Sequence, residues 1–486
     1  MTAPATPPAS PGTSAPPPRP GRGPKVEAHG IDVIGDDERH GRARDLFGVW
    51  AAPSASYLSL VVGGGLVLSG LSLLQALAVI VVGNLFWALV GLIAVSGPAA
   101  GAPSEIVMRA MFGTRGNRFV IGVNGWFVSV CYVALSWSAA SVTAFSLCDR
   151  LGIELNTLGK VLVIVAIAAA TLVISVYGHG LIVRLYLPLA IVTTAVFLVL
   201  GGFLVPHTKW SYVPGTPLHG IALWAALSGG VALVASAALS YNNSADFARY
   251  LPRDTKPFAI AAWTTAGSFV PSVVFTALGA FAATTLDMSD PQNALESVLP
   301  RWFVPVFLIA VIIGAIANNA MTVYSSGLAL QAIGVKLRRS RSVLLDGTAG
   351  VLLTLYALLV SNFLKAVNEM LQLMVALLAP MMAIYVVDLL LRRNRYDGHA
   401  LADESRGGPF WYVGGVHWPG IAALVVGGAA SASFLAVPGL YTGFAASAAG
   451  GIDLSLPVGM LVAAVIYLIG GRPRTALTAP ASEATR

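Results

Sequence analysis

Long apolar runs alternate with short polar segments along most of this chain. Twelve stretches are dominated by apolar residues, at roughly 47–70, 73–96, 119–147, 160–177, 182–205, 217–241, 258–285, 302–334, 343–361, 364–390, 414–437 and 454–470. Most of these stretches are close in length to the roughly 20 residues that a helix needs to cross a bilayer. They also lack the strict alternation of apolar and polar residues that is typical of membrane β-strands. The pattern predicts an all-α integral membrane protein with about twelve transmembrane helices.

Composition and charge agree with a membrane protein. Of 486 residues, 56% are hydrophobic and 10% are charged, whereas a soluble domain has about 25% charged residues. Fifteen basic residues lie in the loops after the second, fourth, sixth, eighth and tenth runs, and five lie in the opposite loops and flanks. The positive-inside rule therefore predicts a multi-pass protein of the plasma (inner) membrane with both termini in the cytoplasm. The net charge of +7 thus gives no reason to expect nucleic acid as a partner.

The chain divides into two polar tails and three apolar regions. Residues 1–45 are rich in Pro, Gly, Ser and Ala, which predicts a disordered cytoplasmic tail, and residues 472–486 form a second short tail. Between them we expect a first repeat over 46–205, a second over 217–390, and two further helices within 412–471.

The two repeats are inferred from interruptions in the first and sixth runs. Pro53, followed by Ser54 and Ser56, predicts a kink or break in the first span, and Gly229–Gly230 with Ser236 predicts one in the sixth. Breaks five spans apart fit inverted five-helix repeats that meet at the bilayer midplane, as in a LeuT-like core. Taken one at a time, each interruption is explained about as well by the general tolerance of membrane helices for Gly and Pro as by an inverted repeat.

Catalytic and metal-binding patterns are missing from the sequence. The seven histidines lie in tails, in loops or near helix ends, and no common hydrolase, ATPase or metal-ligand motif is present. We therefore expect no enzyme activity and no metal or other cofactor. Glu369 is the one acidic residue inside a span and away from a cytoplasmic end, so it is a candidate proton carrier, although a helix pair with Lys365 one turn earlier is the favoured explanation.

Four segments resemble a known family of permeases. They read GLSLLQALAVIVVGNLF (Gly70 to Phe86), GPAAGAPSEIVMRAMFGTRGN (Gly97 to Asn117), SADFARYLPRDT (Ser244 to Thr255) and NNAMTVYSSGLALQAIG (Asn318 to Gly334). These segments are similar to motifs of the nucleobase:cation symporter-1 family, which includes the purine, cytosine, allantoin and hydantoin permeases. The resemblance implies a ten-helix core of two inverted repeats, two extra helices and transport by alternating access.

The resemblance also implies a substrate site between spans 1, 3, 6 and 8. The positions that match the family's site are Tyr132, Ser136, Ser236, Ala237, Asn318 and Asn319, and Ser54 lies at the predicted break beside them. A nucleobase has a π-face and an edge of donors and acceptors, so a Tyr132 ring can stack on it while an Asn319 amide bonds its edge. Helix packing remains the alternative role for the tyrosine and the asparagines.

The expected substrate is an uncharged nucleobase, most simply cytosine or a purine. Another heterocycle, such as allantoin, a hydantoin or a vitamin base, is the alternative within transport, and an integral-membrane enzyme or a channel is a weaker one. Sodium-coupled members of the family carry hydroxyl residues where this chain has Ile313 and Gly314. Because sodium prefers several oxygen ligands, we expect proton coupling or uncoupled uptake, and sodium coupling stays as the less favoured alternative. No obligate protein partner is implied.

Overall fold

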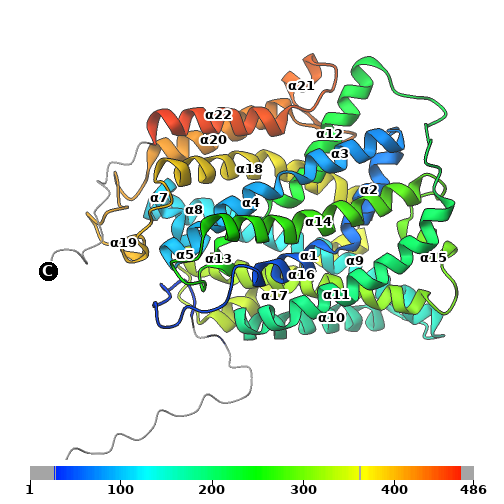
Figure 1. Ribbon diagram of the computed structural model, residues 1–486, viewed down its shortest axis with the longest axis horizontal. Coiled ribbons are helices and arrows are strands. Elements are labelled where there is room, and N and C mark those ends of the chain that lie inside the picture. Colours follow the sequence, from blue (N-terminus) through cyan, green and yellow to red (C-terminus); the bar gives the residue numbers. More distant parts are fainter. Residues whose placement is uncertain (1–26, 28, 361–362, 472–486) are drawn as a thin grey trace, which may run out of the picture.

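The computed structural model describes residue 27, residues 29–360 and residues 363–471, without the side chains of 339–340, 359–360 and 363–368. Most helices lie lengthwise in one bundle (Figure 1). In chain order the elements are α1 (Asp45–Ser54), α2 (Tyr57–Leu68), α3 (Leu73–Asn84), α4 (Trp87–Ala94), α5 (Ser96–Ala100), α6 (Ser104–Val107), α7 (Arg109–Phe112), α8 (Thr114–Val120), the π-helix η1 (Ile121–Phe127), α9 (Val128–Arg150), α10 (Thr157–Tyr177), α11 (His179–Leu204), the 3₁₀ turn η2 (Val205–His207), α12 (Gly220–Leu239), α13 (Ala245–Ala248), α14 (Pro257–Ala283), α15 (Pro291–Val298), α16 (Val304–Ile333), α17 (Arg339–Val360), α18 (Phe363–Leu391), α19 (Gly398–Ala402), α20 (Trp418–Phe434), β1 (Ala436–Val437), β2 (Tyr441–Thr442), α21 (Phe444–Ala448) and α22 (Ser455–Gly470).

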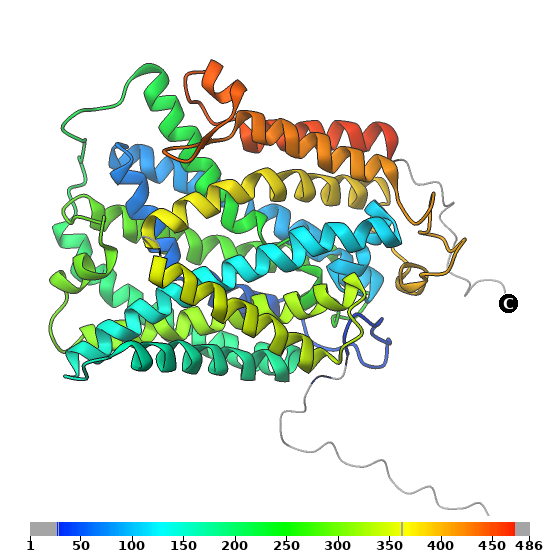
Figure 2. The same cartoon turned by 180° about the vertical axis from the view of Figure 1, so that it is seen from behind.

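The helices account for all twelve predicted apolar runs. In the described part of the chain, nine helices are long and apolar enough to cross a membrane, and the bent pair α1 and α2 makes a tenth span. The last two runs form α20 and α22, which are apolar but shorter, with 17 and 16 residues. They pack on each other and on α18 at one edge of the bundle (Figure 1), and α10 lies along the opposite edge beside α17 (Figure 2).

The predicted break in the first span is present. α1 ends at Ser54 and α2 begins at Tyr57, with a bend of 54° between them. Pro53 lies in the last turn of α1, and Ser56 caps α2 by accepting a hydrogen bond from the Leu58 amide through its side chain, 3.1 Å long. The proline cannot donate a helical hydrogen bond and the serine cap starts a new helix, so these residues define the break.

The break in the sixth span lies elsewhere than predicted. α12 runs without interruption through Gly229, Gly230 and Ser236 to Leu239, and the helix ends only at the polar segment 240–244 that precedes α13. The prediction of a break at Gly229–Gly230 is therefore wrong. A Cβ at Gly230 would lie 2.9 Å from a methyl carbon of Leu66, so close packing against α2 explains this glycine.

Residues 29–44, which their composition predicted to be disordered, lie against the end of the bundle. The Ile34 amide donates to the Gly101 carbonyl over 2.8 Å, and Arg39 donates to the Pro98 carbonyl over 2.6 Å. The predicted tails at 1–26 and 472–486 lie outside the described residues. We call the end of the bundle that carries residues 27–44, α5 to α8, α13 and α19 the tail face (Figure 1).

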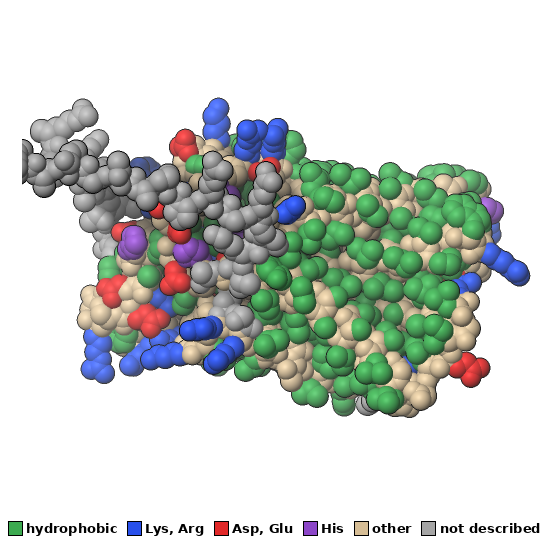
Figure 3. Space-filling model, turned by 90° about the horizontal axis from the view of Figure 1, so that it is seen from below, with side chains coloured by type: hydrophobic (Ala, Val, Ile, Leu, Met, Phe, Trp, Pro, Cys, Tyr) green, Lys and Arg blue, Asp and Glu red, His purple; other side chains and the backbone are tan. Residues whose placement is uncertain are grey.

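The flank of the bundle is apolar and its ends are charged. Figure 3 shows hydrophobic side chains over most of the flank and Lys, Arg, Asp and Glu gathered mainly at the tail face. Exposed large apolar side chains, such as Leu162, Ile191 and Trp263, would be unfavourable in water. The distribution is that of a multi-pass membrane protein.

α2 and α14 approach so closely that each needs a glycine at the contact. A Cβ at Gly63 would lie 1.8 Å from the Thr276 carbonyl oxygen, and one at Gly279 would lie 1.9 Å from the Leu60 carbonyl oxygen. No side-chain atom fits in either place, so the backbones themselves are in contact, as at many small-residue interfaces in membranes.

This contact predicts a clear stability difference between two glycine variants. Gly279→Ala forces α14 away from α2 and should lower the melting temperature of the purified protein by several degrees, because overpacking of this kind costs about 1–3 kcal/mol. Gly229→Ala is the control, since nothing lies within 4 Å of the added methyl group. Equal melting temperatures for the two variants would contradict the packing.

Candidate functional site

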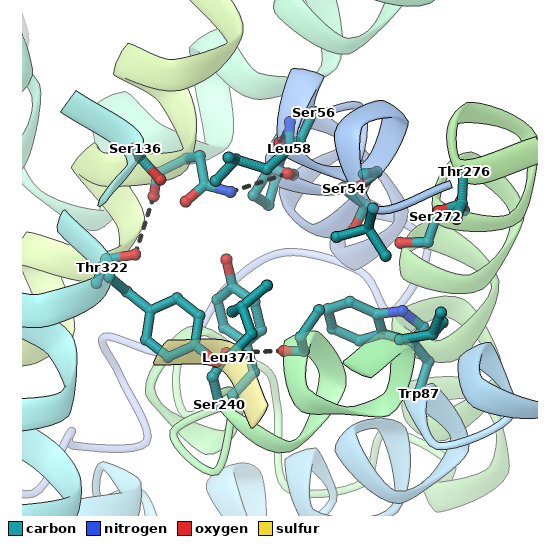
Figure 4. A pocket seen from close by; sticks show the side chains of 18 of the residues that line it. Ser54, Ser56, Leu58, Trp87, Ser136, Ser240, Ser272, Thr276, Thr322 and Leu371 are labelled. Atoms are coloured by element: carbon teal, nitrogen blue, oxygen red, sulfur yellow. Dashed lines mark hydrogen bonds between the residues drawn. The ribbon is translucent and has the colours of Figure 1, made fainter. Parts of the chain in front are cut away.

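A cavity with about 910 Å³ of empty space lies beside the break between α1 and α2 (Figure 4). Residues from α1 and α2, α3 and α4, α9, α12 and the segment after it, α14, α16 and α18 line it. The lining residues are Pro53, Ser54, Ser56, Leu58, Ser59, Val62, Asn84, Trp87, Val128, Ser129, Tyr132, Ser136, Leu233, Val234, Ala237, Ser240, Tyr241, Asn243, Ser272, Thr276, Asn318, Thr322 and Leu371. All of these side chains are uncharged.

Three aromatic rings give the cavity flat apolar surfaces. The rings of Trp87 and Tyr241 lie 5.5 Å apart at an interplanar angle of 34°, and Trp50 meets Tyr241 edge-on at 5.2 Å. Tyr132 comes from α9 and donates its hydroxyl to the Ser236 carbonyl over 3.3 Å. Rings held in this way offer a planar ligand a stacking surface from two sides of the cavity.

The polar groups of the cavity are amides and hydroxyls. Asn318 Nδ2 donates to the Pro53 carbonyl over 3.0 Å, which ties α16 to the end of α1 (Figure 4). Thr322 donates to the Asn318 carbonyl over 3.2 Å. Ser54 Oγ and Asn243 Oδ1 are buried and have no hydrogen-bond partner among the described residues, so both have capacity left for a ligand.

The structure brings five of the predicted site residues together around this cavity. Ser54, Tyr132, Ser136, Ala237 and Asn318 line it. They come from α1, α9, α12 and α16, which correspond to spans 1, 3, 6 and 8. Their ligand roles stay predictions, but their shared location agrees with the site that the family resemblance implied.

Three other predicted residues lie outside the cavity lining. Asn319 is fully buried and donates from Nδ2 to the Val133 carbonyl over 3.1 Å, so its side chain faces α9. Ser236 donates to the Leu233 carbonyl over 2.7 Å, and only its own carbonyl reaches Tyr132. Glu369 is half-buried on α18, two residues before the lining residue Leu371.

Several lining residues were not predicted. Tyr241 and Asn243, in the polar segment that follows the end of α12 at Leu239, both reach the cavity. Trp87 was missed because an aromatic residue within an apolar run gives no signal of its own. The sequence did contain one signal for Tyr241 and Asn243. Tyr241, Asn242 and Asn243 form a polar run between the sixth apolar run and the segment SADFARYLPRDT, and polar residues at such a place mark an interrupted span.

A buried aromatic layer closes the cavity on its tail-face side. Trp50 and Phe247 meet edge-on with centroids 6.0 Å apart, and Phe247 lies 5.3 Å from the Tyr324 ring. Below this layer the fully buried Arg249 donates to the Gly30 carbonyl over 2.7 Å and to Glu27 over 3.3 Å. Glu27 and Gly30 therefore tie the chain before α1 directly to the loop after α12.

Two buried acids also join elements at the tail face. Asp246 accepts hydrogen bonds from the Ser104 amide over 2.8 Å and from the Ser325 hydroxyl over 2.6 Å, and thereby links α13, α6 and α16. Burial, and then the charge of Asp246 beside it, raises the pKa of Glu105 well above its ordinary value. Burial raises the pKa of Asp246 as well. Arg109 donates to the Leu401 carbonyl over 3.0 Å and to Glu404.

The positions expected to bear on sodium binding lie next to the α1 break. A Cβ at Gly314 would lie 3.4 Å from the Ala55 carbonyl oxygen, so α16 faces the break there with no side-chain oxygen. Over the described residues, no group of three or more His, Cys, Asp or Glu side chains is arranged to hold a metal ion. On the face of α16 that carries Gly314, the next side-chain oxygens belong to Asn318 and Thr322, one and two turns further on.

Comparison with known structures identifies the class of fold. The nucleobase-cation-symport-1 family transporter Mhp1, in a closed conformation with bromovinylhydantoin bound, superposes with a TM-score of 0.75 at 18% identity over 93% of this chain and 96% of that chain. Its inward-facing conformation gives a TM-score of 0.70 over 92% and 95% of the two chains. A manganese transporter of Eremococcus coleocola gives 0.54 at 15% identity over 88% and 93%. The fold is that of an all-α membrane transporter, as predicted.

Sequence comparison identifies the family. The family described as permeases for cytosine/purines, uracil, thiamine and allantoin matches residues 33–459. YxlA of Bacillus subtilis (strain 168), which carries the name of a purine-cytosine permease, is 29% identical over 464 residues, covering 93% of this chain and 97% of its own. This chain belongs to that permease family. It is therefore a secondary transporter that works by alternating access, and the expectation that it is not an enzyme is confirmed.

The buried acids predict how stability depends on pH. A raised pKa means that the folded protein binds the Glu105 proton more tightly than the unfolded chain does, so this contribution is present at low pH and is lost as pH rises through the raised value. The melting temperature should fall as pH rises above the ordinary glutamate range of about 4.3. Glu105→Gln should flatten this dependence, whereas Glu154→Gln, which removes an exposed carboxylate, should leave it unchanged. A Glu105→Gln curve parallel to that of the wild type would refute the assignment.

Proposed function

We propose that this permease imports an uncharged nucleobase, most simply cytosine or a purine. The observation that carries the proposal is a cavity whose described lining has no charged side chain but combines the rings of Tyr132, Tyr241 and Trp87 with the amide of Asn318. A flat heterocycle can stack on such rings and bond to amides and hydroxyls along its edge. Amino acids or inorganic ions would require compensating charge at the site.

Membership of the permease family supports the same class of substrate. The family description names cytosine/purines, uracil, thiamine and allantoin, and the name of the Bacillus subtilis relative refers to purine and cytosine. A hydantoin is bound in one of the similar structures, so hydantoins and allantoin form the second group of candidates. Competition among unlabelled heterocycles for uptake distinguishes these groups directly.

We propose that the protein lies in the plasma membrane with its tail face toward the cytoplasm. Arg109, Arg249 and Arg392 lie at this face, where they bond loop carbonyls and acids. The excess of basic loop residues on this side agrees with the positive-inside rule. With the tail face closed by Trp50 and Phe247, the substrate would enter from outside and leave after this layer opens.

We propose that a proton, rather than sodium, drives uptake. Gly314 and Ile313 bring no side-chain oxygen to the face of α16 beside the α1 break, and backbone carbonyls alone would form a poorer cage for a hard cation. Proton coupling needs only a carboxylate that gains and loses a proton during the cycle. Glu369 on α18 is one candidate from the sequence, and its half-buried position is compatible with that role.

Two neighbouring asparagines provide a matched test of the site. Asn318→Ala should weaken nucleobase uptake about tenfold or more in apparent affinity, because it removes an amide from the cavity and the bond to Pro53. Asn319→Ala removes a bond to α9 outside the lining and should mainly lower thermal stability. The measurement is uptake of radiolabelled cytosine and adenine by proteoliposomes, alongside melting temperatures. If Asn319→Ala abolishes uptake at unchanged stability while Asn318→Ala transports normally, the assignment of these two residues is reversed.

Replacement of sodium tests the coupling ion. Uptake by proteoliposomes should persist when external sodium is exchanged for choline, since we find no built sodium site beside Gly314 among the described residues. Initial rates in the two media, at identical pH and osmolarity, are the measurement. A loss of uptake in choline that returns with sodium would show that backbone carbonyls suffice for a sodium site.

A further inference from the structure

A single carboxylate is buried inside the bundle on α17. Asp346 is 2% exposed and lies seven residues after the start of its helix, about 10 Å along the axis. Trp126 Nε1 donates to its Oδ1 over 2.5 Å, and the Ser326 side chain lies beside the carboxyl group. Gly327 of α16 faces the other oxygen, since a Cβ there would lie 4.0 Å from Oδ2.

This carboxylate has no basic partner among the described side chains. α17 packs against α9, α10, α16 and α18. The ionisable residues of these helices and of α17 itself are Cys131, Tyr132, Cys148, Asp149, Arg150, Lys160, Tyr177, Tyr324, Arg339, Arg341, Tyr356, Lys365, Glu369, Tyr385 and Asp388. The structure gives none of the described ones a hydrogen bond or an ion pair with Asp346. The π-helix η1, which supplies Trp126, carries no ionisable residue.

The surroundings fit a protonated acid better than an anion. Removing an unpaired carboxylate from water costs several kcal/mol, so burial without a cation favours the neutral form. The indole N–H of Trp126 can only donate a hydrogen bond, so Asp346 Oδ1 must be the acceptor and cannot carry a proton directed at Trp126. Asp346 Oδ2 and Ser326 Oγ both have no partner among the described residues, and a hydrogen bond between them, with the proton on either oxygen, would give each of them one.

The site is connected to the cavity through two helices. Ser326 lies one turn beyond Thr322 and two turns beyond Asn318 on α16, so the three polar side chains follow one helix face from the cavity lining to Asp346. Trp126 lies in η1, which continues into α9, where Val128, Ser129 and Tyr132 line the cavity. A π-helix within a longer helix is often found at functional positions.

We propose that Asp346 is the proton-binding group of this permease, an inference that rests on the proposed proton-coupled uptake. The carboxylate takes up one proton from the external medium through the hydroxyls of Thr322 and Ser326 while the cavity faces outward. It releases that proton to the cytoplasm after the tail face opens, and no other bond is made or broken.

The test compares Asp346→Asn with the wild type and with Glu369→Gln in proteoliposomes. Asparagine keeps an oxygen for Trp126 but cannot exchange a proton at neutral pH. With the outside one pH unit more acidic, the wild type should accumulate radiolabelled cytosine or adenine about tenfold for one proton per substrate. Asp346→Asn should not accumulate either base above equilibrium, yet it should still exchange labelled for unlabelled base. Glu369→Gln removes the rival candidate on α18 and should still accumulate the base, and Glu154→Gln, which removes an exposed carboxylate, is the control that should behave as the wild type does.

The outcomes separate this inference from the proposed function. If the wild type exchanges neither base, the nucleobase function fails, and the role of Asp346 fails with it. Exchange without pH-driven accumulation in the wild type refutes the proton site and leaves the nucleobase function standing. Full accumulation by Asp346→Asn, or loss of accumulation in Glu369→Gln alone, also overturns the assignment to Asp346.

Trp126→Phe provides a second readout should Asp346→Asn fail to fold. Loss of the indole N–H removes a hydrogen bond that stabilises the anion more than the acid, so the proton binds more tightly. The external pH at which accumulation is half-maximal should therefore rise, with accumulation itself retained. An unchanged half-maximal pH in this variant would also contradict a proton on Asp346.

Discussion

The structure depends on one interruption of a membrane helix and on how its backbone is satisfied. In lipid, backbone groups that leave the helical pattern need partners inside the protein. At the end of α1 the Pro53 carbonyl receives a hydrogen bond from Asn318 of α16, and Ser56 caps α2. The same residues border the cavity, so the groups that make the break tolerable also form the wall that a substrate would meet.

The cavity and its closure use different kinds of interaction. Amides, hydroxyls and aromatic rings surround the cavity, and charged groups are concentrated below the aromatic layer at the tail face. A neutral cavity suits an uncharged ligand, because no fixed charge has to be desolvated or compensated there. Ion pairs and buried acids near the tail-face loops can break when this side opens to water, where their charges are readily solvated. This separation is compatible with alternating access, since one face can open without disturbing the cavity lining.

The sequence allowed much of the fold to be predicted, and parts of the site. Apolar runs of spanning length located the helices, and Pro53 with its serines located the first break, because these signals are local along the chain.

The sixth break was misplaced, since Gly229 and Gly230 are compatible with both an interruption and close packing, and only the three-dimensional contact with Leu66 decides between them. Of the two neighbouring asparagines, Asn319 was the one expected to bond the substrate, whereas Asn318 is the one that lines the cavity. Adjacent helix positions differ by about 100° in direction, and which one faces the cavity depends on the rotation of α16 in the bundle. The proposed proton on Asp346 likewise depends on Trp126 and Ser326, which only the fold brings beside it.

The central claim is that this permease recognises an uncharged flat heterocycle in a cavity without fixed charge. The most direct measurement is competition for uptake of radiolabelled cytosine and adenine by a panel of unlabelled compounds, in proteoliposomes that contain the purified protein. The account predicts that one or more neutral nucleobases compete strongly, and that pyrimidines bearing a carboxylate, amino acids and nucleotides do not. Equal competition by carboxylated and neutral pyrimidines, or no competition by any neutral base or related heterocycle, would contradict it.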